Sequence, residues 1–289
     1  MAEIHHFDHG WVTPAVSYTL SVLGSLLGLT CSIRLRSAPS TGWRLWWLSL
    51  AAVAIGGTGI WTMHFVAMLG FRVVGTPIRY DVGLTAASAL IAVVTVGVGL
   101  VIALLGAGAR RIRILIGGLF AGLGVAAMHY TGMAAMRMFG DVDYARSRVI
   151  ASVVIAVVAA TVALWLALTV ARPAAIMAAA LIMGVAVNGM HFTAMAAMSA
   201  REHTALGTLA GATASALLVP ISVAVLFGLL GLAYALMAAP TEEDRAGAAF
   251  LDGRRSGAGR IPAQRTESPP ARRPGLGNSG WTFRDRAGG

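Results

Sequence analysis

The sequence predicts an all-α fold: a polytopic membrane helix bundle of seven transmembrane helices, six of which form three two-helix pseudo-repeats. Hydrophobic residues make up 57% of the chain and charged residues only 12%, where a soluble domain carries roughly 25% charged residues. The charges bound seven long apolar runs, and a Met-His-aromatic string recurs near the end of three of them. The single cysteine, Cys31, excludes a disulfide-rich secreted protein.

Each apolar run lacks Asp, Glu and Arg and can form a helix of about 20 residues, which crosses a bilayer about 30 Å thick. The runs are Val12–Ile33, Leu45–Phe71, Val82–Ala109, Ile114–Met136, Val149–Ala171, Pro173–Ala200 and about 204–239. Glu3 and Asp8, rather than basic residues, precede the first run. We therefore interpret it as an uncleaved span and not as a signal peptide.

The arginines predict a multi-pass protein of the plasma membrane with the N-terminus outside and the C-terminus in the cytoplasm. All 22 basic residues are Arg, and on this orientation the short inner loops are dense in them. The inner set is Arg34, Arg36, Arg44, Arg110, Arg111, Arg113 and Arg172, with nine more in the tail. Because these residues punctuate apolar runs or lie in the tail, the pI near 11.2 does not indicate nucleic-acid binding.

A change of composition at Pro240 predicts a domain boundary. Residues 1–239 form the seven-helix membrane domain, and residues 240–289 form a cytoplasmic tail rich in Arg, Gly and Pro. The tail lacks the apolar residues needed for a core, so we expect it to be disordered. We expect no soluble output domain in the chain.

The repeat unit starts with an aromatic-Asp pair and ends with a Met-His-aromatic string. The starts are Phe7-Asp8, Tyr80-Asp81 and, more loosely, Asp143-Tyr144, and the ends are Met63-His64-Phe65, Met128-His129-Tyr130 and Met190-His191-Phe192. The three His are 65 and 62 residues apart, which is the length of two spans with their loops. We expect the seventh helix to lie outside the repeats.

The spacing places the three imidazoles at one depth near the outer face. Each His precedes an outer Arg by eight to ten residues, roughly 12–15 Å of helix. Met68, Met133 and Met195 lie four residues after their His, on the same helical stripe. Met63, Met128 and Met190 each directly precede a His and lie to the side of that stripe on their helices. His and Met donors suit copper, with Met favouring Cu(I).

Other roles remain open for several of these residues. Met in an apolar helix is commonly a core filler, and Thr131 and Thr193 are expected to hydrogen-bond within their own helices. Asn188 is a candidate to pair with an imidazole or to bridge helices. We expect Asp8, Asp81 and Asp143 to cap helices, with orientation of the His rings as the alternative. His5, His6 and His9 form a further cluster whose metal binding the sequence leaves open.

The string Met128-His129-Tyr130-Thr131 resembles the full signature of the MHYT domain family, and Met63-His64-Phe65-Val66 and Met190-His191-Phe192-Thr193 resemble its variants. The resemblance covers residues 5–238. It implies a bacterial integral-membrane sensor domain in which Met, His and Tyr residues bind copper and sense oxygen, carbon monoxide or nitric oxide. Phe65 and Phe192 lack a hydroxyl, so only Tyr130 supplies a phenol.

These observations favour a metal-dependent signalling sensor. We expect a copper protein without enzymatic activity of its own that acts on a separate cytoplasmic partner. The alternative is a copper transport or permeation protein, but no His or Met ladder continues inward. A metal-dependent oxidoreductase is a third interpretation, disfavoured because the spans contain no acidic group. The expected partners are the lipid bilayer, a diatomic gas and that signalling partner, without nucleic acid.

The arginine distribution generates a topology prediction. A reporter fused after Arg172 or Pro240 should be cytoplasmic, and one inserted in the loop 141–148 should be external, because positive loops stay inside. Fluorescent and periplasmic reporter activities measure this directly. An external C-terminus would contradict the orientation and the outer location of the His residues.

Overall fold

The computed structural model describes residues 4–5, 10–202, 208–238, 247 and 250–251. The chain divides into two units, Met1–Ala238 and Ala239–Gly289. Seven helical segments of the first unit are long and apolar enough to cross a membrane, which confirms the all-helical bundle. Nearly all of the second unit, and with it the predicted disordered tail, lies outside the described residues.

The seven spans include two π-helical stretches. The elements are α1 (Val12–Arg36), α2 (Thr41–Ala52), η1 (Val53–Thr62), α3 (Met63–Leu69), α4 (Val82–Leu100), η2 (Val101–Leu105), α5 (Arg110–Ala134), α6 (Arg146–Thr169), α7 (Pro173–Met195) and α8 (Ala214–Met237). The second span comprises α2, η1 and α3, and the third comprises α4 and η2. Helices α5 and α6 begin at arginines that the apolar runs excluded. Long Arg side chains can reach the interface from a helix end.

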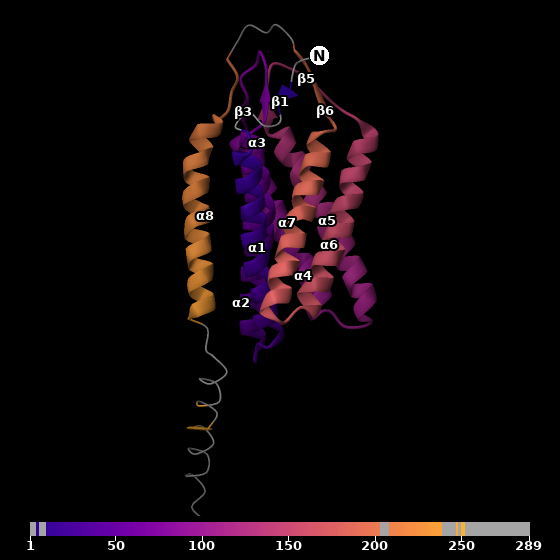
Figure 1. Ribbon diagram of the computed structural model, residues 1–289, viewed down its shortest axis with the longest axis vertical. Helices are drawn as coiled ribbons and strands as arrows, with labels where there is room; N and C mark the ends of the chain where they lie inside the picture. The colour runs from indigo at the N-terminus through magenta and orange to yellow at the C-terminus, as the bar shows by residue number, and fades with distance from the viewer. Residues whose placement is uncertain (1–3, 6–9, 203–207, 239–246, 248–249, 252–289) are drawn as a thin grey trace, which may run out of the picture. The chain divides into compact units, whose positions relative to one another are not determined.

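The second span is the best buried and the seventh is the least. In the most apolar window of each span, 72% of residues are buried for Thr41–Leu69 and 6% for Ala214–Met237. Figure 1 shows α8 beside the bundle, with most of its length away from the other helices. The first six spans therefore form the bundle, as expected from three two-helix repeats.

Helix α1 packs against η1 at backbone distance. A Cβ atom on Gly24 would overlap the backbone of Gly59, and the Ser21 hydroxyl donates to the Gly59 carbonyl at 3.0 Å. Such small residues allow close helix packing in lipid. The π-helical stretch η1 ends at Thr62, directly before Met63 and His64, and π-helical turns frequently mark functional sites.

Three short antiparallel strand pairs lie at one end of the bundle, which we call the strand end (Figure 1). The pairs are β1 (Ile4–His5) with β2 (Arg72–Val73), β3 (Arg79–Tyr80) with β4 (Met136–Arg137), and β5 (Gly140–Tyr144) with β6 (Met198–Glu202). Each pair joins the segment before the first helix of a repeat to the segment after its His-bearing helix. Each repeat thus has its own strand pair, which joins the two ends of that repeat.

The repeated aspartates have different roles. The Asp81 carboxylate accepts from the Leu84 backbone N–H at 3.0 Å and caps α4, as predicted. The expected cap at Asp143 is wrong, because this residue lies within β5 and its carboxylate is 3.6 Å from Arg201 Nε. Helix α6 has no side-chain cap. Asp8 lies outside the described residues.

Asp81 also pairs with Arg137, so one carboxylate links the start of α4 to β4. The Leu84 N–H and the Arg137 guanidinium hold the pKa of Asp81 below its usual value of 3.8. A lowered pKa stabilises the fold at pH values above the unfolded-state pKa, and this contribution is lost as the pH falls through the folded-state pKa.

We predict that Asp81→Asn lowers the melting temperature by a few degrees at neutral pH, because Asn keeps the cap but loses the ion pair. The difference from the natural protein should vanish as the pH falls through the lowered pKa of Asp81. Thermal unfolding in detergent between neutral pH and pH about 3 measures both effects. A difference that persists unchanged at the acid end would contradict the ion-pair role.

Candidate metal centre

Three histidines from three helices meet inside the bundle. His64 lies on α3, His129 on α5 and His191 on α7, with exposed fractions of 3%, 1% and 1%. Their potential ligand atoms all lie within 4.8 Å of one another. The Nδ1 atom of His64 is 3.0 Å from that of His191 and 3.1 Å from that of His129. The sequence prediction of three imidazoles at one depth is confirmed.

The chemistry of this cluster fits a metal ion. A neutral imidazole has one N–H donor and one acceptor nitrogen, so three rings that face one another through Nδ1 cannot all donate and accept there. His129 Nε2 is buried without a hydrogen-bond partner in the described part of the chain. Unpaired nitrogen lone pairs in a lipid-embedded bundle are costly. A cation bound to the three Nδ1 atoms would use their lone pairs, and the N–H of each ring would then lie on Nε2.

Gly132 leaves space for the His64 ring. A Cβ atom on Gly132, three residues after His129 on α5, would overlap His64 Nε2. The rings meet edge to face, with centroids separated by 4.8 Å for His64–His129, 5.1 Å for His64–His191 and 5.2 Å for His129–His191. The position therefore needs a residue without a side chain.

The methionines of the stripe form a layer on the strand side of the histidines. Met68, Met133 and Met195 belong to one buried cluster together with Phe65, Phe71, Val73, Tyr80, Met198 and Ala200. Burial there raises the pKa of Tyr80, which keeps its phenol neutral. Met63, Met128 and Met190 are also buried, at 1%, 2% and 3% exposure. Both sets of predicted thioethers are thus inside the bundle.

Tyr130 and Asn188 are engaged with neighbouring helices. The Tyr130 hydroxyl is 2.8 Å from Ser152 Oγ on α6. The Asn188 amide nitrogen donates to Ser21 Oγ at 3.1 Å and to the Gly184 carbonyl at 2.8 Å. Asn188 therefore bridges helices, which was one of its two expected roles. Thr193 hydrogen-bonds the Gly189 carbonyl within α7, as expected.

A ring of serines, which the sequence analysis missed, ties the repeats together. Ser88 accepts from Trp61 Nε1 at 3.0 Å, Ser152 bonds Tyr130, and Ser17 Oγ lies 3.2 Å from the Asn188 amide oxygen. Each link runs from the span that contains a His to the first helix of the next repeat, and the third link closes the ring.

The three serines share a local geometry. Ser17, Ser88 and Ser152 have exposed fractions of 0–1%. Ser88 and Ser152 also donate to the carbonyl three residues earlier, and the single hydroxyl hydrogen of Ser17 is shared between the Pro14 carbonyl and the Asn188 amide oxygen. Each follows the Asp of its repeat by seven to nine residues. That repeated spacing was the sequence signal for the serine links. It does not predict them by itself, because a single Ser in a helix commonly hydrogen-bonds only its own backbone.

The fold and the cluster define a class: an integral-membrane protein built from three two-helix repeats, each of which contributes one histidine to a buried centre. A family model described as the bacterial signalling protein N-terminal repeat, MHYT, matches residues 57–118 and 122–180. The chain therefore contains an MHYT domain, the repeat of this family. The two matches contain His64 and His129, while His191 lies beyond them and is assigned to the third repeat by its sequence and position.

Similar proteins include bacterial signalling enzymes. The chain is 37% identical over 195 residues, 66% of its length, to a bifunctional diguanylate cyclase/cyclic di-GMP phosphodiesterase, MucR, of Pseudomonas aeruginosa. It is 37% identical over 198 residues, 60% of its length, to the cyclic di-GMP phosphodiesterase NbdA of the same species. It is 32% identical over 155 residues, 53% of its length, to an uncharacterized signaling protein of Caulobacter vibrioides.

These matches cover only a minor part of each relative: 28%, 24% and 18% of their lengths, respectively. A search of solved structures found no match. The shared region therefore establishes family membership, while the activities of the longer relatives remain properties of those proteins.

The contact between Gly132 and His64 generates a prediction with a matched control. Gly132→Ala should destabilise the protein by about 1–3 kcal/mol, because the added methyl group must displace the imidazole. Gly189→Ala, on α7 with no atom near its added Cβ, should be neutral or stabilising. Thermal unfolding and imidazole ¹⁵N chemical shifts measure both. Equal behaviour of the two variants would contradict the close approach.

Proposed function

We propose that the protein is a membrane sensor of a bacterial signalling system whose sensory centre is a metal ion, copper, bound by His64, His129 and His191. The observation that carries the proposal is the convergence of three buried imidazole nitrogens within 4.8 Å. Ionisable or strongly polar side chains are rare inside membranes and commonly functional. Membership of a bacterial signalling family supports the sensor role.

The donor set favours copper among the common metals. Imidazole suits both copper and zinc, whereas thioethers select Cu(I). We propose that methionines complete the shell, from Met68, Met133 and Met195 on the strand side or from Met63, Met128 and Met190 beside the histidines. Tyr130 and Asn188, the accessory candidates, act by holding the His-bearing helices, since their polar atoms already bond other helices.

The bound metal would supply a site for a diatomic ligand, oxygen, carbon monoxide or nitric oxide. Ligand binding would bias the bundle between two helix arrangements, and this requires different affinities for the two. The serine links give such a bias a route, because they connect each His-bearing helix to the next repeat. The similarity to cyclic di-GMP enzymes supports a separate cytoplasmic partner of that class as the output.

The geometry favours this role over copper transport. One helical turn from the histidines, on the side away from the strand end, the corresponding residues are Ile60, Val125 and Val187. Alkyl side chains offer no metal donor, so a relay of ligands does not continue directly from the cluster. Copper uptake by sealed vesicles that contain the protein would revive the transport role.

The central prediction concerns metal content. His64→Ala, His129→Ala and His191→Ala should each lower the copper-to-protein ratio about tenfold or more at limiting copper, because each removes one of three or four donors. Met138→Leu is the matched control, since Met138 lies at the margin of the methionine cluster and outside the repeated stripe. Elemental analysis of protein purified in detergent measures the ratio.

Zinc in place of copper would keep the centre but change its metal. Unchanged metal content in all three His variants, together with a lowered melting temperature, would make the histidines structural and would remove the proposed sensory centre.

A further inference from the structure

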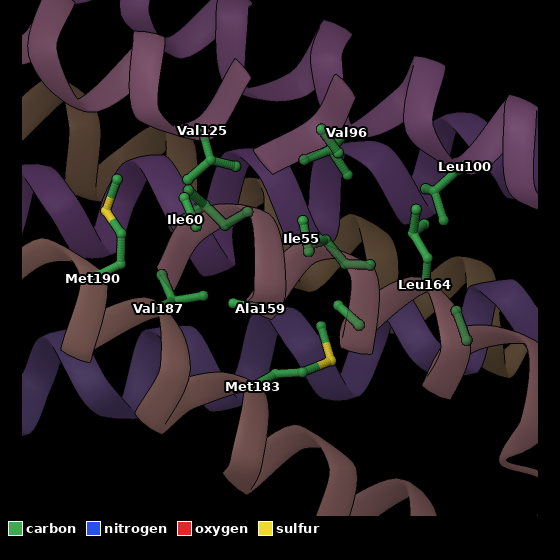
Figure 2. Close-up of a pocket in the computed structure, with 15 residues that line it drawn as sticks. Ile55, Ile60, Val96, Leu100, Val125, Ala159, Leu164, Met183, Val187 and Met190 are labelled. Atoms are coloured by element: carbon green, nitrogen blue, oxygen red, sulfur yellow. The ribbon is translucent and has the colours of Figure 1, made fainter. Parts of the chain in front are cut away.

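An apolar space lies inside the bundle on the other side of the histidines from the strand end. It has a volume of about 50 Å³ and is lined by 15 residues from η1, α4, α5, α6 and α7. Every lining residue is Ala, Val, Ile, Leu or Met, so no charged group or side-chain hydrogen-bond donor faces it. Figure 2 shows Met190, Val125 and Ile60 toward one end and Leu100 and Leu164 toward the other.

The repeat places this cavity next to the histidine cluster. Three lining residues, Ile60, Val125 and Val187, stand four positions before His64, His129 and His191 respectively. They form an alkyl layer one helical turn, about 5–6 Å, below the imidazoles. Met190, which directly precedes His191, also lines the space. The cavity is therefore separated from the candidate metal centre by a single layer of side chains.

Small residues on α6 leave the space unfilled. Six of the lining residues come from this helix, and five are alanines: Ala156, Ala159, Ala160, Ala163 and Ala167. Ala159, Ala160 and Ala163 are only half-buried. The α6 wall of the cavity therefore borders the outer surface of the bundle, which is lipid in a membrane.

The lining selects the kind of molecule that fits. A water molecule needs about 10–15 Å³ in this measure but also two to four polar partners, and apolar cavities stay dry and bind apolar molecules or xenon. The volume is too small for a lipid chain or an aromatic drug and suits a molecule of two or three heavy atoms. Such molecules reach the α6 wall by dissolving in the bilayer.

We propose that this cavity is a binding site for a small non-polar molecule, of the size of a diatomic gas or a xenon atom, that enters from the membrane. The site uses no metal, so it stands independently of the proposed copper centre. Its position one helical turn from the histidines would also hold a non-polar gas beside that centre, and this last consequence rests on the proposed function.

Xenon is the probe, measured by ¹²⁹Xe NMR on chelator-treated protein in phosphatidylcholine nanodiscs, with empty nanodiscs as the lipid background. The natural protein should show a saturable bound-xenon signal. Ala160→Leu should weaken xenon binding by about tenfold or more, because its added carbon atoms occupy the cavity. Leu164→Ala, which removes a lining side chain of 5% exposure, should strengthen it.

The matched control is Val158→Leu, which enlarges a side chain on the lipid-facing side of α6 with 56% exposure and should leave xenon binding unchanged. Xenon uptake no greater than lipid partitioning would overturn the proposal, as would equal binding by Ala160→Leu and Val158→Leu. If Ala160→Leu does not fold, the opposite effect expected of Leu164→Ala still decides the question. Copper content, measured separately, distinguishes failure of this site from failure of the metal centre.

Discussion

An imidazole in hydrocarbon has to satisfy a donor and an acceptor nitrogen without help from water. In this protein three imidazoles meet at 1–3% exposure, and within the described residues no acidic side chain joins their cluster. The rest of the bundle is arranged to bring them together: Gly132 leaves room for His64, and the close contact of Gly24 with Gly59 draws α1 onto the second span. A cation at the shared nitrogens would resolve the remaining competition between them.

The histidine layer is one of three stacked layers that follow from helical geometry applied to a threefold repeat. Residues four positions after each His form the methionine layer, and residues four positions before form the alkyl layer over the cavity. The molecule therefore changes from soft donors through nitrogen donors to pure hydrocarbon within about two helical turns. Hydrocarbon on one side of a metal site would favour access by ligands that dissolve in lipid over access by ions that travel in water.

The sequence predicted what each repeat determines by itself. The length of the apolar runs indicated the seven spans. The similar distances of eight to ten residues from each His to the Arg after its helix indicated a common depth, because both inferences depend only on the rise per residue. The sequence did not predict the contacts between repeats. The π-helical stretch before His64, the strand that takes Asp143 away from α6, and the cavity beside the alanines of α6 all depend on how neighbouring helices fit. The sequence alone does not distinguish an alanine that lines a cavity from an alanine that packs against a helix.

The serine ring explains why the aromatic position after His can differ between repeats. Each His-bearing helix needs one polar group that reaches the buried serine of the next repeat, and only the second repeat uses the residue after His, Tyr130, for this purpose. Trp61 and Asn188, each three positions before their His, make the equivalent bonds in the other repeats. Phe65 and Phe192 therefore leave no serine unpaired. The Tyr130 hydroxyl acts as a link between helices, and a metal centre of nitrogen and sulfur donors does not require it.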